Sequence, residues 1–231
     1  MIDIKGKWAL VTGASRGVGR QVAMALAQKG CNLVLHSRKT SGTDELVKEL
    51  SATGVEVHQT EAEMSDIESV KKLAEKAEAL SGGIDILFNN AAVMTAYKED
   101  IYSAPKEDYI TSFTVNTIAP ITICNHIIPK MIERGFGRVV NVTSGIKDQP
   151  QLMPYAASKA ALDKFVYDMA PHLKGTGVLM NLLDPGWLRT DLGGPQAPNA
   201  VESVIPGALV PILLDDETCG KFFCAQDYRE D

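Results

Sequence analysis

Thr12-Gly13-Ala14-Ser15-Arg16-Gly17-Val18-Gly19 joins an apolar strand pattern at Trp8–Thr12 to a helical pattern at Val18–Gln28, and this junction decides the fold. Its glycines allow a sharp turn and let the main chain approach a pyrophosphate, which then lies at the free N–H groups of a helix N-terminus. The spacing is G-x-x-x-G-x-G rather than G-x-G-x-x-G, and a glycine trio alone often just ends a strand. The position between strand and helix, at the start of the sheet, predicts a dinucleotide-binding loop.

Short aliphatic or β-branched runs alternate with longer helical patterns along the rest of the chain. Most of the runs are apolar without alternation, as expected for strands covered by helices on both faces of a parallel sheet. The pattern predicts an α/β fold, a Rossmann-like doubly wound and mostly parallel sheet of seven strands with helices on both faces. The expected strands are Trp8–Thr12, Asn32–His36, Val55–His58, Ile84–Phe88, Arg138–Val142, Val178–Leu183 and Lys221–Cys224. The expected helices are Val18–Gln28, Asp44–Ala52, Ile67–Leu80, Lys106–Glu133, Met153–Lys174 and Val201–Leu214.

The bulk composition limits the class of protein. A chain of 231 residues with 45% hydrophobic residues suits one α/β domain, and we find no repeat or linker, so we expect residues 1–231 to form a single domain. No apolar run is long enough to span a bilayer, and the N-terminus has no signal-peptide segment, which predicts a cytoplasmic protein. The net charge of −6 without basic clusters argues against nucleic acid or a membrane as the main partner.

The cysteines and histidines give no metal-binding pattern. The four cysteines lie apart with no C-x-x-C spacing, and the four histidines form no H-x-x-x-H or H-E-x-x-H arrangement. We therefore expect buried thiols and no catalytic metal.

A tyrosine and a lysine four residues apart form the central catalytic candidate. Tyr155-Ala156-Ala157-Ser158-Lys159 begins a helical segment, so the phenol and the ammonium lie on one face. A nearby cation lowers the pKa of a tyrosine from its usual value of about 10, and this predicts that Tyr155 is a general acid for a carbonyl oxygen. Tyr102 and Lys106 have the same spacing, but Pro105 between them argues against a continuous helix.

Two more polar residues accompany the Tyr155 segment. Ser144 follows the strand Arg138–Val142 at the carboxyl edge of the sheet, where doubly wound folds bind ligands. Asn116 lies in a helical pattern with Pro120 four residues later, and proline cannot donate to the Asn116 carbonyl. The freed carbonyl could hold a water molecule, although a simple kink is the alternative.

Taken together, the motifs resemble the short-chain dehydrogenase/reductase family in its single-domain branch, from Lys5 to about Thr190. Ala92 replaces a usual glycine, Glu63 replaces a usual aspartate, and the Ser144–Tyr155 loop is short. The matching motifs are Thr12-Gly13-x-x-x-Gly17-x-Gly19, Asn89-Asn90-Ala91, Asn116, Ser144, Tyr155-x-x-x-Lys159 and Pro185-Gly186-x-x-x-Thr190.

The resemblance implies a role for each matching residue. Tyr155 would be the acid/base, Ser144 would orient the substrate oxygen, and Lys159 would hold the nicotinamide ribose and lower the pKa of Tyr155. The Asn116 carbonyl would anchor a proton-relay water. The implied cofactor contacts are Gly13, Ser15, Arg16, Gly17, Val18, Gly19, Ser37, Arg38, Glu63, Met64, Asn90, Ala91, Tyr155, Lys159, Pro185, Gly186, Leu188 and Thr190.

The residues at the expected adenosine end favour NADPH over NADH. A protein that uses NADH commonly has an acidic residue at the end of the second strand, where it binds the ribose 2′-hydroxyl. That position is Ser37, Arg38 follows it, and Arg16 is expected to point to the same place from the glycine loop. Arginine forks suit phosphate geometry, so NADP is the expected cofactor and NAD the less favoured one. The alternative is that Arg38 and Lys39 form only a solvated turn.

The sequence also indicates a lid, an oligomer and a substrate class. The glycine- and proline-rich segment at about 191–200 is expected to be a short lid, and Leu152, Met153 and Trp187 nearby indicate a modest apolar pocket. In relatives, the helix that starts near Tyr155 helps to form a four-helix dimer interface, so we expect a homodimer or homotetramer. Its small side chains permit close helix approach, or they pack only on their own sheet: Ala156, Ala157, Ala160 and Ala161.

The expected activity is oxidoreduction of a small carbonyl or alcohol. A non-catalytic NADP-binding sensor or scaffold is the alternative from another class, although both Tyr155 and Lys159 are present. A nucleotide-sugar epimerase conflicts with the short C-terminal region and the glycine spacing. An acyl-carrier 3-oxoacyl reductase would need a basic docking patch, for which the candidates are Lys130, Arg134 and Lys174.

Overall fold

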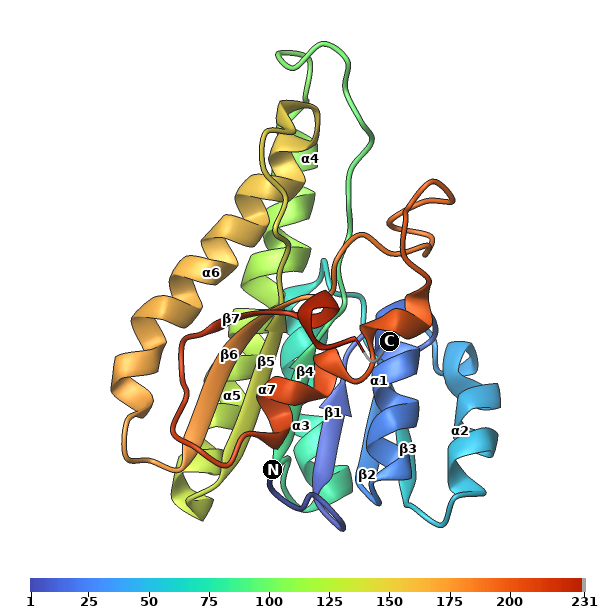
Figure 1. The fold of residues 1–231 in the computed structure, drawn as a ribbon, viewed down its shortest axis with the longest axis vertical. Helices are drawn as coiled ribbons and strands as arrows, with labels where there is room; N and C mark the ends of the chain where they lie inside the picture. The colour runs from blue at the N-terminus through green and yellow to red at the C-terminus, as the bar shows by residue number, and fades with distance from the viewer. Residues whose placement is uncertain (230–231) are drawn as a thin grey trace.

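A seven-stranded parallel sheet organises the chain, in the order β3-β2-β1-β4-β5-β6-β7. The structure is a computed structural model that describes residues 1–229 (Figure 1). The predicted fold class is confirmed. The strands are β1 (Trp8–Val11), β2 (Asn32–Ser37), β3 (Val57–Glu61), β4 (Ile86–Asn89), β5 (Gly137–Val142), β6 (Val178–Asp184) and β7 (Phe222–Cys224).

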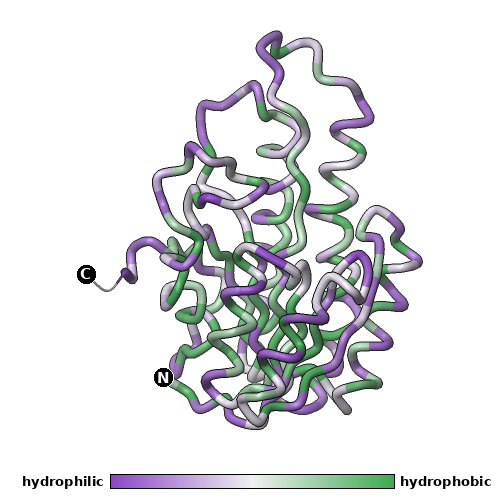
Figure 2. Tube along the Cα trace, turned by 90° about the vertical axis from the view of Figure 1, so that its right-hand side faces the viewer, coloured by the Kyte–Doolittle hydropathy of each residue, from purple (hydrophilic) through white to green (hydrophobic). Residues whose placement is uncertain are grey.

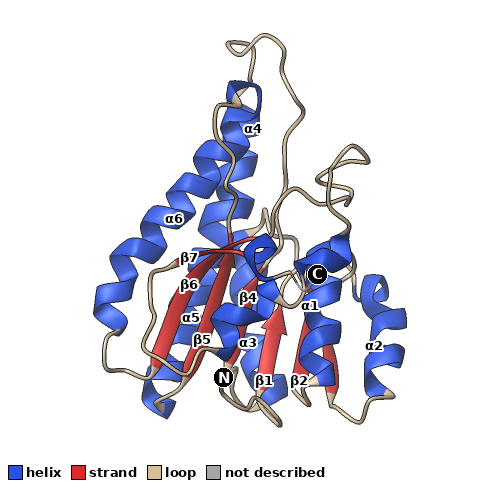
Figure 3. Ribbon diagram, viewed as in Figure 1, coloured by secondary structure: helices blue, strands red, loops and turns tan. Residues whose placement is uncertain are grey.

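Helices cover both faces of this sheet (Figure 3). The core on one face contains residues of α1, α2 and α7, and the core on the other contains residues of α3, α5 and α6. Successive residues of β1 alternate between them, since Ala9 and Val11 belong to the first core and Leu10 to the second. The helices are α1 (Gly17–Gln28), α2 (Asp44–Ser51), α3 (Ile67–Ser81), α4 (Lys106–Phe113), α5 (Ala119–Arg134), α6 (Met153–Leu173) and α7 (Val210–Leu213).

The strand order reverses between β1 and β4, and ligands of doubly wound sheets bind at such a reversal, beyond the carboxyl ends of the strands. Figure 2 shows hydrophobic residues concentrated in the body of the molecule, while the tips of the long loops are mostly hydrophilic. Within residues 1–229, no helix has both the length and the apolar character needed to cross a membrane.

The expected helix Lys106–Glu133 is interrupted near Asn116. A π-helical turn at Thr114–Ile118 separates α4 from α5, and the Ala119 N–H donates to the Thr114 carbonyl five residues back. Pro120 cannot supply the ordinary N–H at this point, so a wider turn takes its place. The continuous helix was wrong, whereas a break at Asn116 was the expected consequence of Pro120.

The expected helix Val201–Leu214 was also wrong. The segment forms two short 3₁₀ turns, Val201–Val204 and Gly207–Leu209, before the single-turn α7. Pro206 and Pro211 each remove a backbone donor, so an apolar period of helical type does not produce a continuous helix here.

The other differences between the expected and the observed elements are shifts in strand ends. The strand expected at Val55–His58 runs from Val57 to Glu61.

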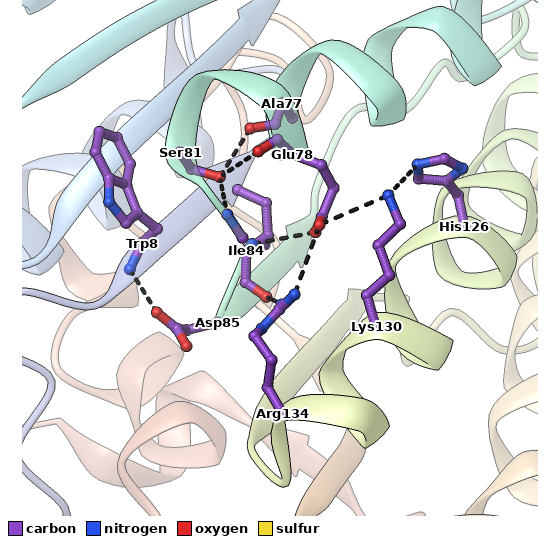
Figure 4. A network of polar contacts seen from close by, with 10 residues as sticks. Trp8, Ala77, Glu78, Ser81, Ile84, Asp85, His126, Lys130 and Arg134 are labelled. Atoms are coloured by element: carbon purple, nitrogen blue, oxygen red, sulfur yellow. Dashed lines mark hydrogen bonds and ion pairs between the residues drawn. The ribbon is translucent and has the colours of Figure 1, made fainter.

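A buried carboxylate joins α3 to α5 at the amino edge of the sheet (Figure 4). Glu78 is 9% exposed, accepts the Ile84 N–H at 3.1 Å, and lies 3.7 Å from Lys130 Nζ and 3.6 Å from Arg134 Nη1. Arg134 also donates to the Ile84 carbonyl at 2.6 Å, and Lys130 lies 3.0 Å from His126 Nε2. One carboxylate therefore fixes the entry into β4 and the end of α5 together.

We expect Glu78→Ala to lower the free energy of unfolding by about 2 kcal/mol. Removing one partner of a fully buried ion pair costs about 3–5 kcal/mol, and partial exposure of both cations reduces this. Urea denaturation of the purified protein measures the change. Glu68→Ala is the control on the same helix, since Glu68 pairs with Lys71 on the exposed surface, and it should leave the unfolding midpoint unchanged. Equal midpoints for Glu78→Ala and the wild type would contradict this role.

Candidate active site

Two glycines of the loop after β1 are required by its geometry. Gly13 has φ +67° and Gly17 has φ +59°, a region that other residues rarely adopt. A Cβ at Gly19 would overlap the Gly13 carbonyl oxygen. The start of α1 therefore lies directly on the end of β1, as the sequence predicts.

The N-terminus of α1 fits an anionic ligand. No side chain caps it, and its first turn contains no acidic residue, so its N–H groups are left for another acceptor. Ser15, Gly17 and Val18 are partly exposed at this turn. A pyrophosphate at this position would meet a favourable dipole, and the residues present fit a dinucleotide cofactor.

Asn90 and Thr12 tie the end of β4 to the glycine loop. The Asn90 side chain donates to the Thr12 carbonyl at 2.9 Å and to the Gly13 carbonyl at 3.2 Å. The Thr12 hydroxyl accepts the N–H groups of Asn90 and Ala91 at 2.9 and 3.0 Å. Asn90 and Ala91 thus stand beside the glycine loop, and the Asn90 side chain is engaged in holding it.

Arg16 at the glycine loop pairs with a residue of the segment after β6. Its Nη1 forms an ion pair with Asp191 Oδ2 at 2.8 Å, with the two side chains 67% and 69% exposed. A contact of Arg16 with the adenosine end of a cofactor stays a prediction. The carboxylate of Asp191 competes for the guanidinium, and only the fold brings residues 16 and 191 together.

A local hydrogen bond fixes the main chain at the end of β2. The buried Ser37 hydroxyl donates to the Lys39 carbonyl at 2.6 Å, while Arg38 is exposed. Glu63 accepts the Ser65 N–H at 3.2 Å, and Met64 is buried beside it. Contacts of Glu63 and Met64 with a cofactor stay predictions.

The structure brings Ser144, Tyr155 and Lys159 together where β5 ends and α6 begins. The Ser144 hydroxyl lies near Tyr155 and accepts the Ile146 N–H at 3.3 Å. The buried Lys159 donates to the Val142 carbonyl at 2.7 Å, and its Nζ lies 5.9 Å from the centre of the Tyr155 ring. The i, i+4 spacing was therefore a correct guide to proximity.

The expected lowering of the Tyr155 pKa was wrong in direction. Burial raises the pKa of Tyr155, the nearby Ser144 hydroxyl acts against this, and the Asp184 carboxylate raises the pKa further. Burial also lowers the pKa of Lys159 to about 8, while Asp163 opposes that change. Tyr155 consequently keeps its proton at neutral pH.

Asn116 is fixed at the π-helical turn by its side chain. Its Oδ1 accepts the Val93 N–H at 2.8 Å, and its Nδ2 donates to the Val93 carbonyl at 2.8 Å and to the Ser158 hydroxyl at 3.0 Å. These bonds join the segment after β4 to α6, one residue before Lys159. A water on the Asn116 carbonyl stays a prediction.

Two carboxylates near this group were not singled out from the sequence. Asp163 accepts the Thr143 hydroxyl, immediately before Ser144, and Asp184 accepts the Gly186 N–H at 2.9 Å. Asp163 lies four residues after Lys159, and Asp184 directly precedes Pro185. These positions relative to Lys159 and Pro185 can be read from the sequence and could have identified both carboxylates. In residues 1–229, no three His, Cys, Asp or Glu side chains gather in a way that could hold a metal ion.

The segment after β6 lies over the glycine loop. Thr190 Cγ2 is 3.6 Å from where a Cβ of Gly17 would be, and Pro185 accepts a hydrogen bond from Gln226 at 2.8 Å. An isolated β-bridge joins Leu188 to Asn199, so the segment expected to be a lid is a loop whose two ends are joined. Thr190 therefore lies beside the glycine loop, whereas contacts of Pro185, Gly186 and Leu188 with a cofactor stay predictions.

Comparison with known proteins places the chain in a family. The short chain dehydrogenase family matches residues 7–200. A short chain dehydrogenase of Pseudocercospora fijiensis is 35% identical over 84% of this chain, and the match covers 63% of that protein. An L-rhamnose 1-dehydrogenase (NADP(+)) of Thermoplasma acidophilum is 33% identical over 83% of this chain, and the match covers 76% of that protein. The solved 3-oxoacyl (acyl-carrier-protein) reductase of Agrobacterium tumefaciens with NADP bound has a TM-score of 0.86 at 26% identity, covering 96% of this chain and 93% of its own.

This chain belongs to the short-chain dehydrogenase/reductase family and is an oxidoreductase. The resemblance that its motifs indicated is confirmed.

Proposed function

We propose that this protein catalyses the NADPH-dependent reduction of a small ketone or aldehyde, or the reverse oxidation of the alcohol, with Tyr155 as the acid. The observation that carries the proposal is the buried Tyr155, with Ser144 nearby and Lys159 Nζ 5.9 Å from its ring centre, at the sheet edge that holds the glycine loop. When bound, a nicotinamide dinucleotide supplies or accepts the hydride.

Each polar group has one task in this proposal. The phenol of Tyr155 donates to the carbonyl oxygen of the substrate and transfers its proton as that oxygen gains negative charge. The Ser144 hydroxyl orients the same oxygen. The positive charge of Lys159 favours the phenolate left behind, and a water on the Asn116 carbonyl returns the proton.

Tyr155→Phe should lower kcat by at least about 100-fold, the usual contribution of general acid–base catalysis, with cofactor affinity nearly unchanged. The variant keeps the ring and removes the acid. Steady-state oxidation of NADPH with a panel of small carbonyls measures turnover, and fluorescence titration measures affinity. A non-catalytic sensor would show no turnover in the wild type either.

Tyr102→Phe is the matched control. Tyr102 is 91% exposed, and α4 begins only at Lys106, so the second pair with this spacing is not on one helix. Turnover should equal that of the wild type. Near-normal turnover in the Tyr155 variant would overturn the proposed acid.

The residues at the end of β2 support NADP as the cofactor. Ser37 carries no charge that would repel a 2′-phosphate, and the exposed Arg38 has space to meet one. The NADP named for the Thermoplasma relative and bound in the Agrobacterium structure gives further support. Because Arg16 pairs with Asp191, Arg38 alone carries the argument in this structure.

We expect kcat/KM to be about tenfold higher with NADPH than with NADH, from one charged hydrogen bond to the phosphate. The double change Ser37→Asp and Arg38→Ile should make kcat/KM higher with NADH than with NADPH. The new carboxylate repels the 2′-phosphate of NADPH and accepts a hydrogen bond from the ribose 2′-hydroxyl of NADH. Initial rates with both cofactors and one substrate decide this. Preference for NADH in the wild type is the contrary result.

The substrate is proposed to be small and largely apolar. Trp187 is exposed and fastened to the lid by its Nε1, which donates to the Gly193 carbonyl at 2.7 Å, and Met153 is exposed at the start of α6. A carrier protein has little to bind, since Lys130 and Arg134 are engaged with Glu78 at the opposite edge of the sheet. We propose one catalytic domain with residues 191–200 as its lid; cytoplasmic location and the absence of a nucleic-acid or membrane partner stay predictions.

A homodimer or homotetramer is part of the proposal. Ala160 is exposed on α6, and Ala156, Ala157 and Ala161 are only partly buried, so these small residues do not all pack on their own sheet. Ile118 and Tyr167, on the π-helical turn and α6, are exposed as well. Light scattering at micromolar concentration should give twice or four times the 24.9 kDa monomer mass. A monomer mass would refute this.

A further inference from the structure

A histidine lies beneath the glycine loop and has no part in the mechanism above. His36, in β2, is 1% exposed and receives the Gly13 N–H on its Nδ1 at 3.2 Å. Its Nε2 is 3.1 Å from the Ala62 carbonyl, just after β3. Its main-chain carbonyl accepts the Ala14 N–H at 2.9 Å. One residue thus binds two successive N–H groups of the loop.

These partners define the protonation state of the ring. The Gly13 N–H can only donate, so Nδ1 must carry a lone pair, and the Ala62 carbonyl can only accept, so Nε2 must carry the hydrogen. Burial lowers the pKa of His36, while the bond to Ala62 and the charge of Glu63 act in the opposite direction. A neutral ring with hydrogen on Nε2 is the one form that satisfies both partners.

The orientation of Gly13 matters for the whole loop. Gly13 has a φ of +67°, and this conformation sets the directions of its N–H and its carbonyl. The carbonyl lies against Gly19 and accepts a hydrogen bond from Asn90. A rotation of this peptide would move the start of α1. His36 fixes the N–H side and Asn90 fixes the carbonyl side.

We propose that His36 is a positioning residue for cofactor binding, whose neutral imidazole sets the Gly13 peptide and links the phosphate-binding loop to the segment after β3. The proposal rests on the proposed function, since it assumes that the loop binds a nicotinamide dinucleotide. Protonation of Nδ1 would place a second hydrogen against the Gly13 N–H and break this link.

The groups around His36 allow a pH test. Glu63, after β3, is the charged side chain that acts on the ring. The adjoining residues of the other elements carry no charge: Gly13 and Ala14 in the loop, Ser37 in β2, and Thr60, the partner of His36 in β3. Acidification therefore acts on His36 through its own ring and, more weakly, through Glu63.

Two amide variants separate the two hydrogen bonds. His36→Asn places an amide oxygen near the Nδ1 position and so keeps the acceptor for Gly13, whereas His36→Gln keeps a donor for Ala62. His36→Leu removes both. We expect the NADPH dissociation constant to rise about tenfold or more in His36→Leu and His36→Gln, and to stay within about threefold of the wild type in His36→Asn. Turnover at saturating NADPH should change little.

A purely structural histidine would give another result. All three variants would then lower the thermal midpoint without separating in NADPH affinity, and this outcome overturns the proposal. Should His36→Leu fail to fold, the comparison of His36→Asn with His36→Gln decides alone.

The pH profile is the second readout. Burial lowers the pKa of His36 below its usual value of about 6.5, so the ring stays neutral at neutral pH. NADPH affinity of the wild type should therefore fall through ring protonation only below that pH. The 2′-phosphate of NADPH also titrates near pH 6, so the ratio of wild type to His36→Asn at each pH isolates the ring. A ratio that already changes above pH 6.5 refutes the proposal, because burial holds the ring neutral there. Both readouts measure binding, so their failure leaves the role of Tyr155 to its own test.

Discussion

The contact of Gly19 with the Gly13 carbonyl governs the half of the molecule that we propose binds the cofactor, since no side chain fits between them. It brings the uncapped N-terminus of α1 onto the end of β1, at the point where the strand order reverses. The neighbouring strands then stabilise that turn. Asn90 comes from the end of β4 and His36 from β2, and each binds one side of the Gly13 peptide. The anion site is thus a product of three strands and one helix, although its sequence signature is a single loop.

The proposed catalytic group depends on a second junction, between β5 and α6. Lys159 donates to the last residue of β5, Val142, and Asp163 binds the hydroxyl of Thr143 directly after it. These bonds fix the helix to the two residues that directly precede Ser144. Asn116 then joins the same helix to the segment after β4, so a π-helical turn and a strand end hold Tyr155 in place.

The sequence predicted what local pattern controls and missed what tertiary contacts control. The alternation of strands and helices, the glycine loop and the Tyr155–Lys159 pair need only nearby residues, and they were correctly located. The pairing of Arg16 with Asp191 joins residues far apart in the chain, so no local rule indicates it. The period at Val201–Leu214 is helical, but two prolines decide against a continuous helix. The partners of His36 are main-chain groups, which have no sequence signature.

The ionisation of Tyr155 shows why charge alone misled the sequence argument. Two unit charges about 6 Å apart attract by about 3 kcal/mol at an effective dielectric constant near 20, enough to lower a pKa by about two units. That attraction requires the lysine to be charged when the tyrosine ionises. Burial lowers the pKa of Lys159 to about 8 and raises that of Tyr155 above its ordinary value, so on raising the pH the ammonium loses its proton first. Burial of both groups therefore opposes a phenolate–ammonium pair, and the attraction of Lys159 only partly offsets the cost of forming a buried phenolate.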